Sequence, residues 1–403
     1  MTAHRGAAAS ARLRVGVALC AALTLGGCTT LAEYVPSIPP PSFDWLRALF
    51  GYDTKKPGPL PDINATVTPQ VAWQVSLGKG ALGFTPAVTA GAIYAATPGG
   101  TIVRIDPASG STAWRIEAGT KLSAGVGADA ALVVVGTEKG DVLAFDTSGK
   151  ALWQAKISSE VVGPPKVAED TVIVWSGDGR TFGLAAADGK TKWVYQRVNP
   201  ALVVRNYAGG VISRGGLFTG TAGGKLLAMD LATGNVGWEG NVATPKGATE
   251  LERIADVTSL PLVEERQVCA VAFQGRVACF EIVRGTLNWS RDISSLTGLA
   301  DDNRYIFTCD DGSSMYAFDR ATGASAWKQD KLAQRRLGGP QVAGDYLLAV
   351  DAEGYAHLFD RNNGGLVGRI PTDGTSATSQ PVQAGVNAVW QSLGGTMYAM
   401  TAR

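Results

Sequence analysis

The sequence predicts an all-β protein, an eight-bladed β-propeller of four-stranded antiparallel blades. Three observations predict this fold. An acid, a glycine and a tryptophan recur with regular spacing, a further glycine marks eight registers at intervals of 37 to 51 residues, and alternating apolar segments such as VLAFD lie between the two glycines. Alternation with a period of two is typical of half-buried strands. Four short strands in about 40 residues match the size of one propeller blade.

Composition agrees with strands and turns more than with helices. The chain has 403 residues, of which 51 are glycine and only 18% are charged, whereas helical bundles carry more Glu, Lys and Leu. This length suffices for one large all-β domain. The formal net charge is +1, and the absence of a basic excess argues against a nucleic-acid partner.

The first 27 residues are expected to be a targeting segment and not part of the fold. Three arginines and no acid lie within residues 1–14, and the apolar run VGVALCAALTL follows. This run is shorter than the roughly 20 residues that span a bilayer. It ends in Leu-Gly-Gly before Cys28, which resembles a bacterial lipoprotein signal. The alternative is a plain secretory signal with a chance cysteine.

The resemblance to a lipoprotein signal implies removal of residues 1–27 and attachment of lipid, palmitate included, to Cys28. Thr29 follows the cysteine, and the lack of an acid there favours the outer membrane. Several acyl chains hold a protein stably on a membrane, whereas one holds it weakly. Residues 28–69 are proline-rich and are expected to form an extended tether. Residues 70–403 are expected to form the propeller.

Each residue type of the repeated motif has an expected structural role. Its clearest copies are DPASGSTAW, DLATGNVGW and DRATGASAW, at 106–114, 230–238 and 319–327. The acid can accept hydrogen bonds from main-chain N–H groups of a tight turn, and glycine supplies the positive φ. The tryptophan can wedge between neighbouring blades. Weaker copies are Asp146 to Trp153, Gly189 to Trp193, Glu281 to Trp289, and Asp360 to Gly364 with Gly368 where tryptophan is expected.

The eight registers predict how the ring closes. They are marked by Gly100, Gly140, Gly179, Gly224, Gly275, Gly312, Gly354 and Gly395. The eighth register ends before any tryptophan, and the missing strand stands at the other end of the repeat region, as VAWQVSL around Trp73. We therefore expect the Trp73 strand to complete the C-terminal blade, which removes open sheet edges. The spacing resembles the pyrroloquinoline-quinone (PQQ)-type propeller repeat over residues 70–403.

That resemblance raises two alternatives, a PQQ-dependent dehydrogenase-like quinoprotein and a periplasmic ligand-binding propeller. Quinoprotein dehydrogenases carry a vicinal cysteine pair and a calcium site, and no two cysteines are adjacent here. His357 alone cannot build a His-rich metal site or a triad. The acids at 301–302 and 310–311 are interpreted as hairpin turn acids, although calcium needs further oxygens. No catalytic residue, metal or cofactor is assigned, and the chain is not expected to be an enzyme.

Cys269 and Cys279 flank an expected hairpin at Gln274-Gly275. A two-residue turn there would pair Cys279 with Ala270 and place the two thiols on opposite faces of the sheet. A bulge could bring the thiols together, and an oxidising compartment would permit a disulfide. The sequence leaves both outcomes open.

Two connections break the regularity of the repeat. The distance from each tryptophan to the next register glycine is 23 to 27 residues in most blades, but 31 from Trp193 and 37 from Trp238. The extra residues include NPALVVRN at 199–206 and ATELERIADVTSLP at 248–261. Equivalent connections of neighbouring blades lie on one rim, so the two insertions should lie side by side. Aliphatic and charged groups on such loops suit a protein partner; the alternative is that each loop packs on its own blade.

The signal, the eight repeats and the two insertions together resemble the BamB family of β-barrel assembly lipoproteins, over essentially the whole mature chain. The resemblance implies a non-catalytic scaffold that binds the periplasmic POTRA domains of BamA, within the assembly complex of the outer membrane. It implies a lipid-anchored propeller facing the periplasm, with nascent outer-membrane proteins as further partners. The implied partner-binding residues are Leu202, Val204, Arg205, Arg253 and Asp256.

Three residues of the second insertion bear further on this expected binding site. Thr258 stands where the family often has a second acid. Glu252 and Arg253 are expected to order the second insertion through a mutual or neighbouring ion pair, which contributes about 0–1 kcal/mol when exposed.

Overall fold

The computed structural model describes residues 57–204 and 209–402. These residues belong to one compact unit, Lys55–Arg403. Cys28, the signal segment and Arg205 lie outside the described residues. Within the described ranges there are 32 strands and no helix, and hence none that could cross a bilayer.

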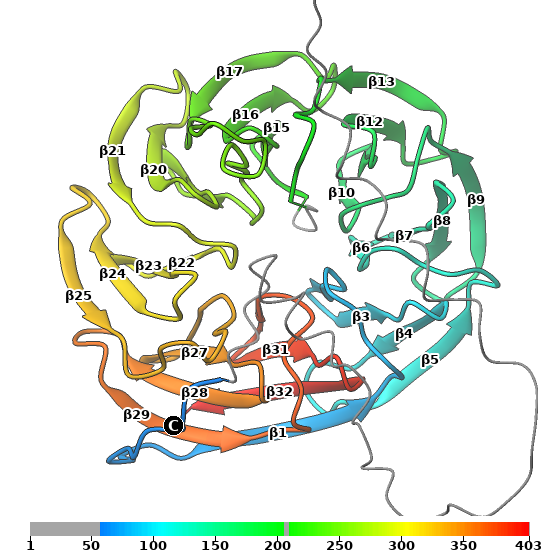
Figure 1. Ribbon diagram of the computed structural model, residues 1–403. Coiled ribbons are helices and arrows are strands. Elements are labelled where there is room, and N and C mark those ends of the chain that lie inside the picture. Colours follow the sequence, from blue (N-terminus) through cyan, green and yellow to red (C-terminus); the bar gives the residue numbers. More distant parts are fainter. Residues whose placement is uncertain (1–56, 205–208, 403) are drawn as a thin grey trace, which may run out of the picture. The chain divides into compact units, whose positions relative to one another are not determined.

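The strands form eight four-stranded antiparallel blades arranged as a ring (Figure 1). Each innermost strand neighbours the innermost strands of the two adjacent blades, all the way round. From the inner to the outer strand, blades 1 to 4 contain β2 Ala87–Thr89, β3 Ala92–Ala96, β4 Thr101–Ile105 and β5 Thr112–Glu117; β6 Gly127–Ala128, β7 Leu132–Gly136, β8 Asp141–Asp146 and β9 Ala151–Lys156; β10 Lys166–Ala168, β11 Thr171–Trp175, β12 Arg180–Ala185 and β13 Thr191–Gln196; β14 Gly210–Ser213, β15 Gly216–Gly220, β16 Lys225–Asp230 and β17 Val236–Asn241.

Blades 5 to 8 contain β18 Leu262–Val263, β19 Gln267–Val271, β20 Arg276–Glu281 and β21 Leu287–Asp292; β22 Leu299–Asp301, β23 Tyr305–Cys309, β24 Met315–Asp319 and β25 Ser325–Gln329; β26 Gln341–Ala343, β27 Tyr346–Val350, β28 Tyr355–Asp360 and β29 Leu366–Pro371; β30 Val382–Ala384, β31 Asn387–Gln391, β32 Thr396–Ala402 and β1 Pro69–Ser76. The expected eight-bladed all-β propeller is confirmed.

The ring closes as expected from the sequence. β1 pairs antiparallel with β32, from Pro69 opposite Ala402 to Ser76 opposite Thr396, with a bulge between Val71 and Trp73. The first strand of the repeat region is therefore the outer strand of the last blade. This closure joins the two ends of the repeat and leaves each blade with a neighbour on both sides.

The core lies between the blades. The second strand of each blade is buried along most of its length, as in β7 with LVVVG and β11 with TVIVW. These two strands contribute to one cluster between blades 2 and 3. Strands covered on both faces are apolar throughout rather than alternating, whereas the outer strands such as β9 alternate in exposure.

The acid-glycine motif forms the turn between the third and fourth strands. In the first copy the Asp106 carboxylate accepts the main-chain N–H of Ser109 at 2.8 Å, and Gly110 has φ 72°. The same bond recurs from Thr233 to Asp230 at 2.8 Å and from Thr322 to Asp319 at 2.9 Å. The roles expected for the acid and the glycine of the motif are confirmed.

Each motif tryptophan packs on the acid turn of the next blade. Trp193 Nε1 donates to the Leu231 carbonyl at 3.0 Å, and a Cβ added to Gly234 would lie 2.5 Å from the indole. Equivalent indole bonds reach the next turn from Trp73, Trp114, Trp153, Trp238, Trp289 and Trp327. The glycine of these turns is therefore needed for two reasons: it adopts a positive φ, and it lets the indole ring approach closely.

The junction between blades 7 and 8 explains the missing tryptophan. β32 and β1 lie at opposite ends of the chain, so blade 8 has no acid turn on which an indole could pack. Gly368 stands at the tryptophan position, and a Cβ there would lie 2.5 Å from the Val67 carbonyl oxygen. Residues preceding β1 occupy this space.

The ring has two rims. Connections between strands 1 and 2 and between strands 3 and 4 of a blade lie on one rim, which we call the turn rim. Connections between strands 2 and 3, and from each outer strand to the next blade, lie on the other rim. Both unusually long connections belong to this second class, so we call it the insertion rim.

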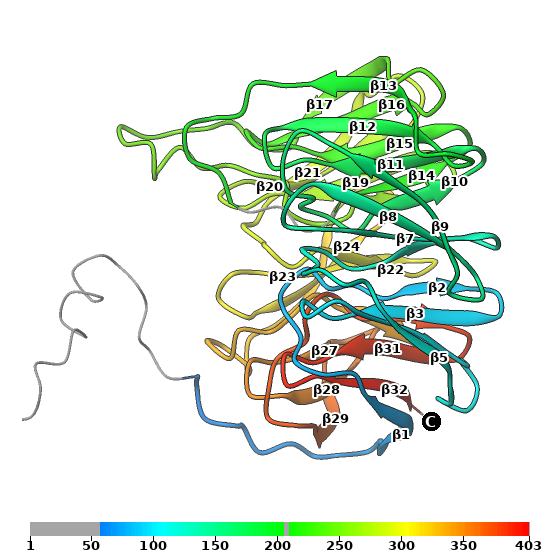
Figure 2. The ribbon, with the colours of Figure 1, turned by 90° about the vertical axis from the view of Figure 1, so that its right-hand side faces the viewer.

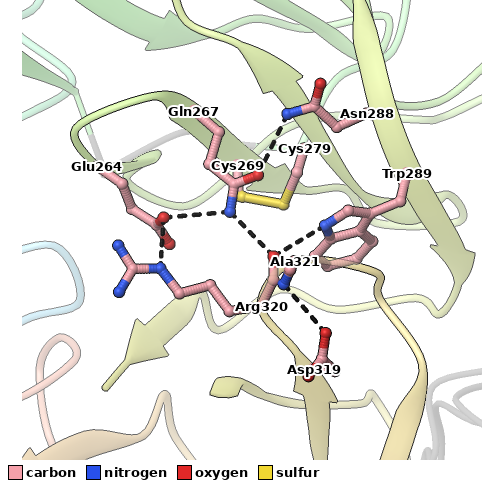
Figure 3. The surroundings of a disulfide bond; sticks show 9 residues. All are labelled: Glu264, Gln267, Cys269, Cys279, Asn288, Trp289, Asp319, Arg320 and Ala321. Atoms are coloured by element: carbon pink, nitrogen blue, oxygen red, sulfur yellow. Dashed lines mark hydrogen bonds and ion pairs between the residues drawn. A yellow bond between two sulfur atoms is a disulfide. The ribbon is translucent and has the colours of Figure 1, made fainter. Parts of the chain in front are cut away.

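Cys269 on β19 and Cys279 on β20 face each other and form a disulfide, with Cα atoms 4.0 Å apart (Figure 3). The expectation of a two-residue turn is wrong. Val271 pairs with Val277, and the Ala272 N–H donates to the Arg276 carbonyl at 3.2 Å. The loop is therefore one residue longer, and this shifts the register by one and brings both thiols to one face.

Candidate functional site

The candidate site consists of the two long connections. The first insertion, residues 197–209, joins β13 to β14, and the second, residues 242–261, joins β17 to β18. Figure 2 shows loops of this part of the chain, in green to yellow-green, projecting on one side of the ring. The expectation that the insertions lie side by side is confirmed by the bond described next.

Asp256 connects the two insertions. Its carboxylate accepts the main-chain N–H of Val204 at 2.6 Å and that of Gly223 at 2.8 Å. The residue is 2% exposed, so both carboxylate oxygens are used inside the protein. Hydrogen bonds to a charged acceptor are stronger than neutral ones. Asp256 therefore sets the position of the Val204 segment, and its carboxylate does not project to solvent.

The second insertion contains one capped turn of helix-like chain. The Thr249 hydroxyl accepts the N–H of Glu252 at 3.2 Å, and the Glu252 carboxylate accepts the N–H groups of Ala248 and Thr249. The Arg253 N–H then donates to the Thr249 carbonyl. This is a capping box. It went unrecognised in the sequence, where its signal was Thr-x-x-Glu in TELE.

Arg253 forms an ion pair with a neighbouring acid, Glu250, which is one of the two arrangements expected for it. Its guanidinium lies 3.4 Å from Glu250, and both side chains are about half exposed. Glu252 is instead engaged with the main chain of its own turn, and these N–H bonds lower the pKa of its carboxyl, Thr249 first. The guanidinium of Arg253 thus remains accessible from outside.

A groove of about 360 Å³ separates the insertions. Leu202 lines it from the first insertion and Arg253 from the second, with Pro200 and Pro245 also in the wall. Leu202 is 46% exposed and Val203 is 42% exposed. Exposed aliphatic side chains beside a guanidinium give the site an apolar centre and a charged edge.

A network of charged groups joins blades 3 and 4 next to this groove, which Arg197 helps to line. Glu239 on β17 pairs with Arg197 at 3.1 Å and with Lys225 at 3.0 Å. The bonds from Lys225 and then Arg197 lower the pKa of the Glu239 carboxyl. The network ties the start of the first insertion to the neighbouring blade.

The expected site residues fall into three groups. Leu202, Val204, Arg253 and Asp256 come together around the two insertions, whereas Arg205 and Cys28 lie outside the described residues. Val204 and Asp256 are internal partners, and Leu202 and Arg253 face the groove. Thr258, which stands where the family often has a second acid, donates its hydroxyl to the Leu296 carbonyl at 3.4 Å.

The histidine and the acids weighed as metal-binding or catalytic groups are engaged in contacts within the propeller. His357 is buried, its Nε2 lies 3.0 Å from Asp351, and burial lowers its pKa. The Asp302 and Asp310 carboxylates accept main-chain N–H groups of their own turns, which confirms these two as turn acids. Asp301 instead ends β22, and the Asp311 carboxylate accepts a hydrogen bond from the Ser294 hydroxyl. In residues 57–204 and 209–402, no group of three or more His, Cys, Asp or Glu is arranged to hold a metal.

Comparison with known proteins identifies relatives. The family model described as outer membrane protein assembly factor BamB matches residues 98–329 and 317–403. A curated relative from Nitrosomonas eutropha, outer membrane protein assembly factor BamB, is 44% identical over 82% of this chain and 81% of its own. The crystal structure of BamB from Moraxella catarrhalis has a TM-score of 0.77, with 25% identity over 83% of this chain and 100% of that one.

A quinohemoprotein alcohol dehydrogenase from Comamonas testosteroni shares the fold alone, with a TM-score of 0.66 and 13% identity over 82% of this chain and 76% of that one. The residues matched by the family model include both insertions. The chain therefore belongs to the family of outer membrane protein assembly factor BamB.

Proposed function

We propose that this chain is a non-catalytic scaffold that assists assembly of outer-membrane proteins by holding a POTRA domain of BamA at the paired insertions. Family membership supports the assembly role, because curated relatives are named as assembly factors. The choice of partner comes from the resemblance seen in the sequence. The paired insertions supply a surface of suitable chemistry for a protein partner.

The observation that carries the proposal is the bond from Val204 to Asp256. It holds the first insertion so that Leu202 stays exposed at the groove, with Val203 exposed next to it in the chain. Exposing aliphatic side chains to water is unfavourable by about 25 cal/mol per Å² of apolar area, and a partner that covers them removes this cost. Arg253, and by sequence Arg205, would supply the polar edge common at protein interfaces.

The proposed location is the outer membrane, with the propeller in the periplasm and lipid at Cys28. The signal-like segment supports export, and the Cys269–Cys279 disulfide supports an oxidising compartment. A membrane anchor raises the effective concentration of the propeller near a membrane-bound partner without any additional contact. Weak docking at the groove is then sufficient for function.

Co-purification from detergent-solubilised membranes tests the proposal. The variants Leu202→Asp, Arg253→Glu and Arg205→Glu should each reduce recovered BamA several-fold while thermal unfolding of the purified propeller stays unchanged. Leu152→Asp is the matched control, because Leu152 is 50% exposed on the outer strand β9, away from the insertions. It should leave BamA recovery at the wild-type level.

Recovery of BamA at wild-type level with all three groove variants would reject the site. No recovery of BamA with the wild-type chain would reject the proposed partner. Bound quinone or calcium after reconstitution, with matching cofactor absorbance, would favour the dehydrogenase-like alternative.

A further inference from the structure

Residues 57–68, which precede β1 and are called the strap below, lie along blade 7. At one end of the strap, the Gly58 carbonyl accepts a hydrogen bond from Arg335 Nη1. At the other end, the N–H groups of Thr66 and Val67 both donate to the Val367 carbonyl, at 2.8 and 3.0 Å. The strap thus crosses the blade from end to end.

The contact at Gly58 is built from buried groups. Arg335 is 1% exposed, and its Nε lies 2.7 Å from Asp351 while its Nη2 reaches Glu353. The Asp351 carboxylate also accepts a hydrogen bond from the ring of His357 at 3.0 Å. The carboxylate that pairs with the guanidinium is therefore itself held in place. A Cβ added to Gly58 would lie 2.7 Å from the Ala333 carbonyl oxygen. The chain can approach this closely only with glycine at position 58.

The middle of the strap is held by polar and apolar contacts. Arg369 on β29 donates to the Pro61 carbonyl at 3.1 Å. Ile63 packs on the core cluster between blades 6 and 7, and Val67 packs on the cluster between blades 7 and 8. Of these contacts, only those at Val67 lie where a tryptophan packs at the other blade junctions, because the Val67 carbonyl faces Gly368.

The two ends of the strap lie on different rims. Arg335 belongs to the connection from β25 to β26, which is equivalent to the two insertions, so Gly58 lies on the insertion rim. Pro69 pairs with Ala402 at the end of β32, which is on the turn rim. In Figure 2 the blue strap runs across the ring to the side on which the insertions project. The chain therefore enters the propeller from the insertion rim.

We propose that the strap biases the orientation of the anchored propeller, so that the insertion rim and its groove face the membrane more often than the turn rim does. This rests on the proposed function through the lipid at Cys28. A chain released at Pro69 would leave from the turn rim and turn the groove away from the bilayer. The surface so presented fits a folded partner domain that lies close to the membrane, between the bilayer and the ring.

Tether length does not oppose this role. Residues 28–56, the part of the expected tether that precedes the strap, could reach on the order of 100 Å if fully extended. This length allows the ring to stand off from the membrane by the width of a small domain. The length of a tether by itself selects no orientation. The point at which the tether joins the ring supplies that information, because a chain leaving the far rim must pass around the propeller.

The first experiment concerns the strap alone, in the purified mature chain. Amide hydrogen exchange should show the N–H groups of Thr66 and Val67 protected at least tenfold over an unstructured chain. Gly58→Leu should weaken this protection, because the new side chain meets the Ala333 carbonyl. Gly91→Leu is the matched control, since a Cβ there meets nothing within 4 Å. Unprotected strap amides in the wild type would overturn the proposal.

The second experiment uses the full lipidated chain on liposomes. Val198→Cys on the insertion rim and Val283→Cys on the turn rim are 90% and 76% exposed in the wild type, and each carries one fluorophore, because Cys309 is buried. Quenchers attached to lipid headgroups should quench the dye at 198 more strongly than the dye at 283. Gly58→Leu should reduce this difference, and Gly91→Leu should not.

Equal or reversed quenching on protein that floats with the liposomes would overturn the proposed orientation and leave the anchor intact. Protein that does not float would instead contradict the lipid anchor, and with it the proposed location. Hydrogen exchange still judges the strap in that case, so the two failures are distinguishable.

Discussion

The main-chain N–H of Val204 donates a 2.6 Å hydrogen bond to the buried carboxylate of Asp256, across 52 residues of sequence. This bond joins two connections of neighbouring blades into one surface. Its donor belongs to the main chain, so the identity of residue 204 matters less than the acceptor at residue 256.

Asp256→Ala should destabilise the propeller by about 2–4 kcal/mol, because two buried N–H groups lose a charged acceptor. It should also reduce BamA recovery, because Leu202 is no longer held at the groove. Urea unfolding and co-purification measure the two effects. Asp345→Ala is the control, since the Asp345 side chain is 89% exposed on another blade. Unchanged recovery with Asp256→Ala would show that the bond does not order the docking surface.

Replacing both Cys269 and Cys279 by alanine should lower the free energy of unfolding by about 2–3 kcal/mol, the loop-entropy expectation for a ring of roughly ten residues. Denaturant unfolding with and without reductant measures this. Reductant should destabilise the wild type by a similar amount and leave the double variant unaffected. A reductant effect that persists in the double variant would contradict the assignment to this disulfide.

Asp301 predicts a pH dependence of stability. Burial, and then the charge of Glu264, raise the pKa of Asp301 to about 6, while Arg320 partly opposes the shift. Asp302 adds a further unfavourable charge. Because the folded-state pKa lies above the unfolded value, this carboxyl binds protons more tightly when folded, and its contribution to stability falls as pH rises from about 4 through 6.

Asp301→Asn should therefore stabilise the protein at pH 7.5 and lose this advantage near pH 4. Urea unfolding at pH 4, 5, 6 and 7.5 tests the sign. Asp345→Asn, an exposed acid of the next blade, serves as the comparison. A gain from Asp301→Asn that grows toward low pH would contradict the raised pKa.

Gly368→Trp restores the repeat motif but should destabilise the protein, by about 1–3 kcal/mol or more. The Val67 carbonyl already occupies the space of a side chain at this position. The indole should displace the strap, so hydrogen exchange at Thr66 and Val67 should accelerate in the variant. Greater stability with an intact strap would mean that the junction can accept both.

The fold was readable from the sequence because its determinants are local. Each blade needs an acid to accept N–H groups of a turn, a glycine with positive φ and an aromatic residue one strand later, and these recur in order along the chain. Even the closing role of the Trp73 strand followed from counting, since eight registers leave one strand unmatched. The adjacency of the two insertions followed from blade topology in the same way.

The strand register at the disulfide and the burial of individual side chains could not be predicted from the sequence. One additional loop residue after Val271 decided the relation of Cys269 to Cys279, which the sequence had left open. Asp256 resembled a surface acid in sequence, yet Val204 and Gly223 enclose its carboxylate. Nothing in the motif at Gly368 indicated that the residues before β1 would fill the junction.

The sequence by itself determined that this chain is a closed ring of eight repeated blades with two neighbouring long connections. Only the tertiary structure decided which side chains face the groove, that the thiols meet, and from which rim the N-terminal chain enters. The physical reason is range. Turn chemistry and strand periodicity act over a few residues, whereas Asp256, Gly368 and Arg335 take their roles from groups 33 to 301 residues away in the chain, which only folding brings into contact.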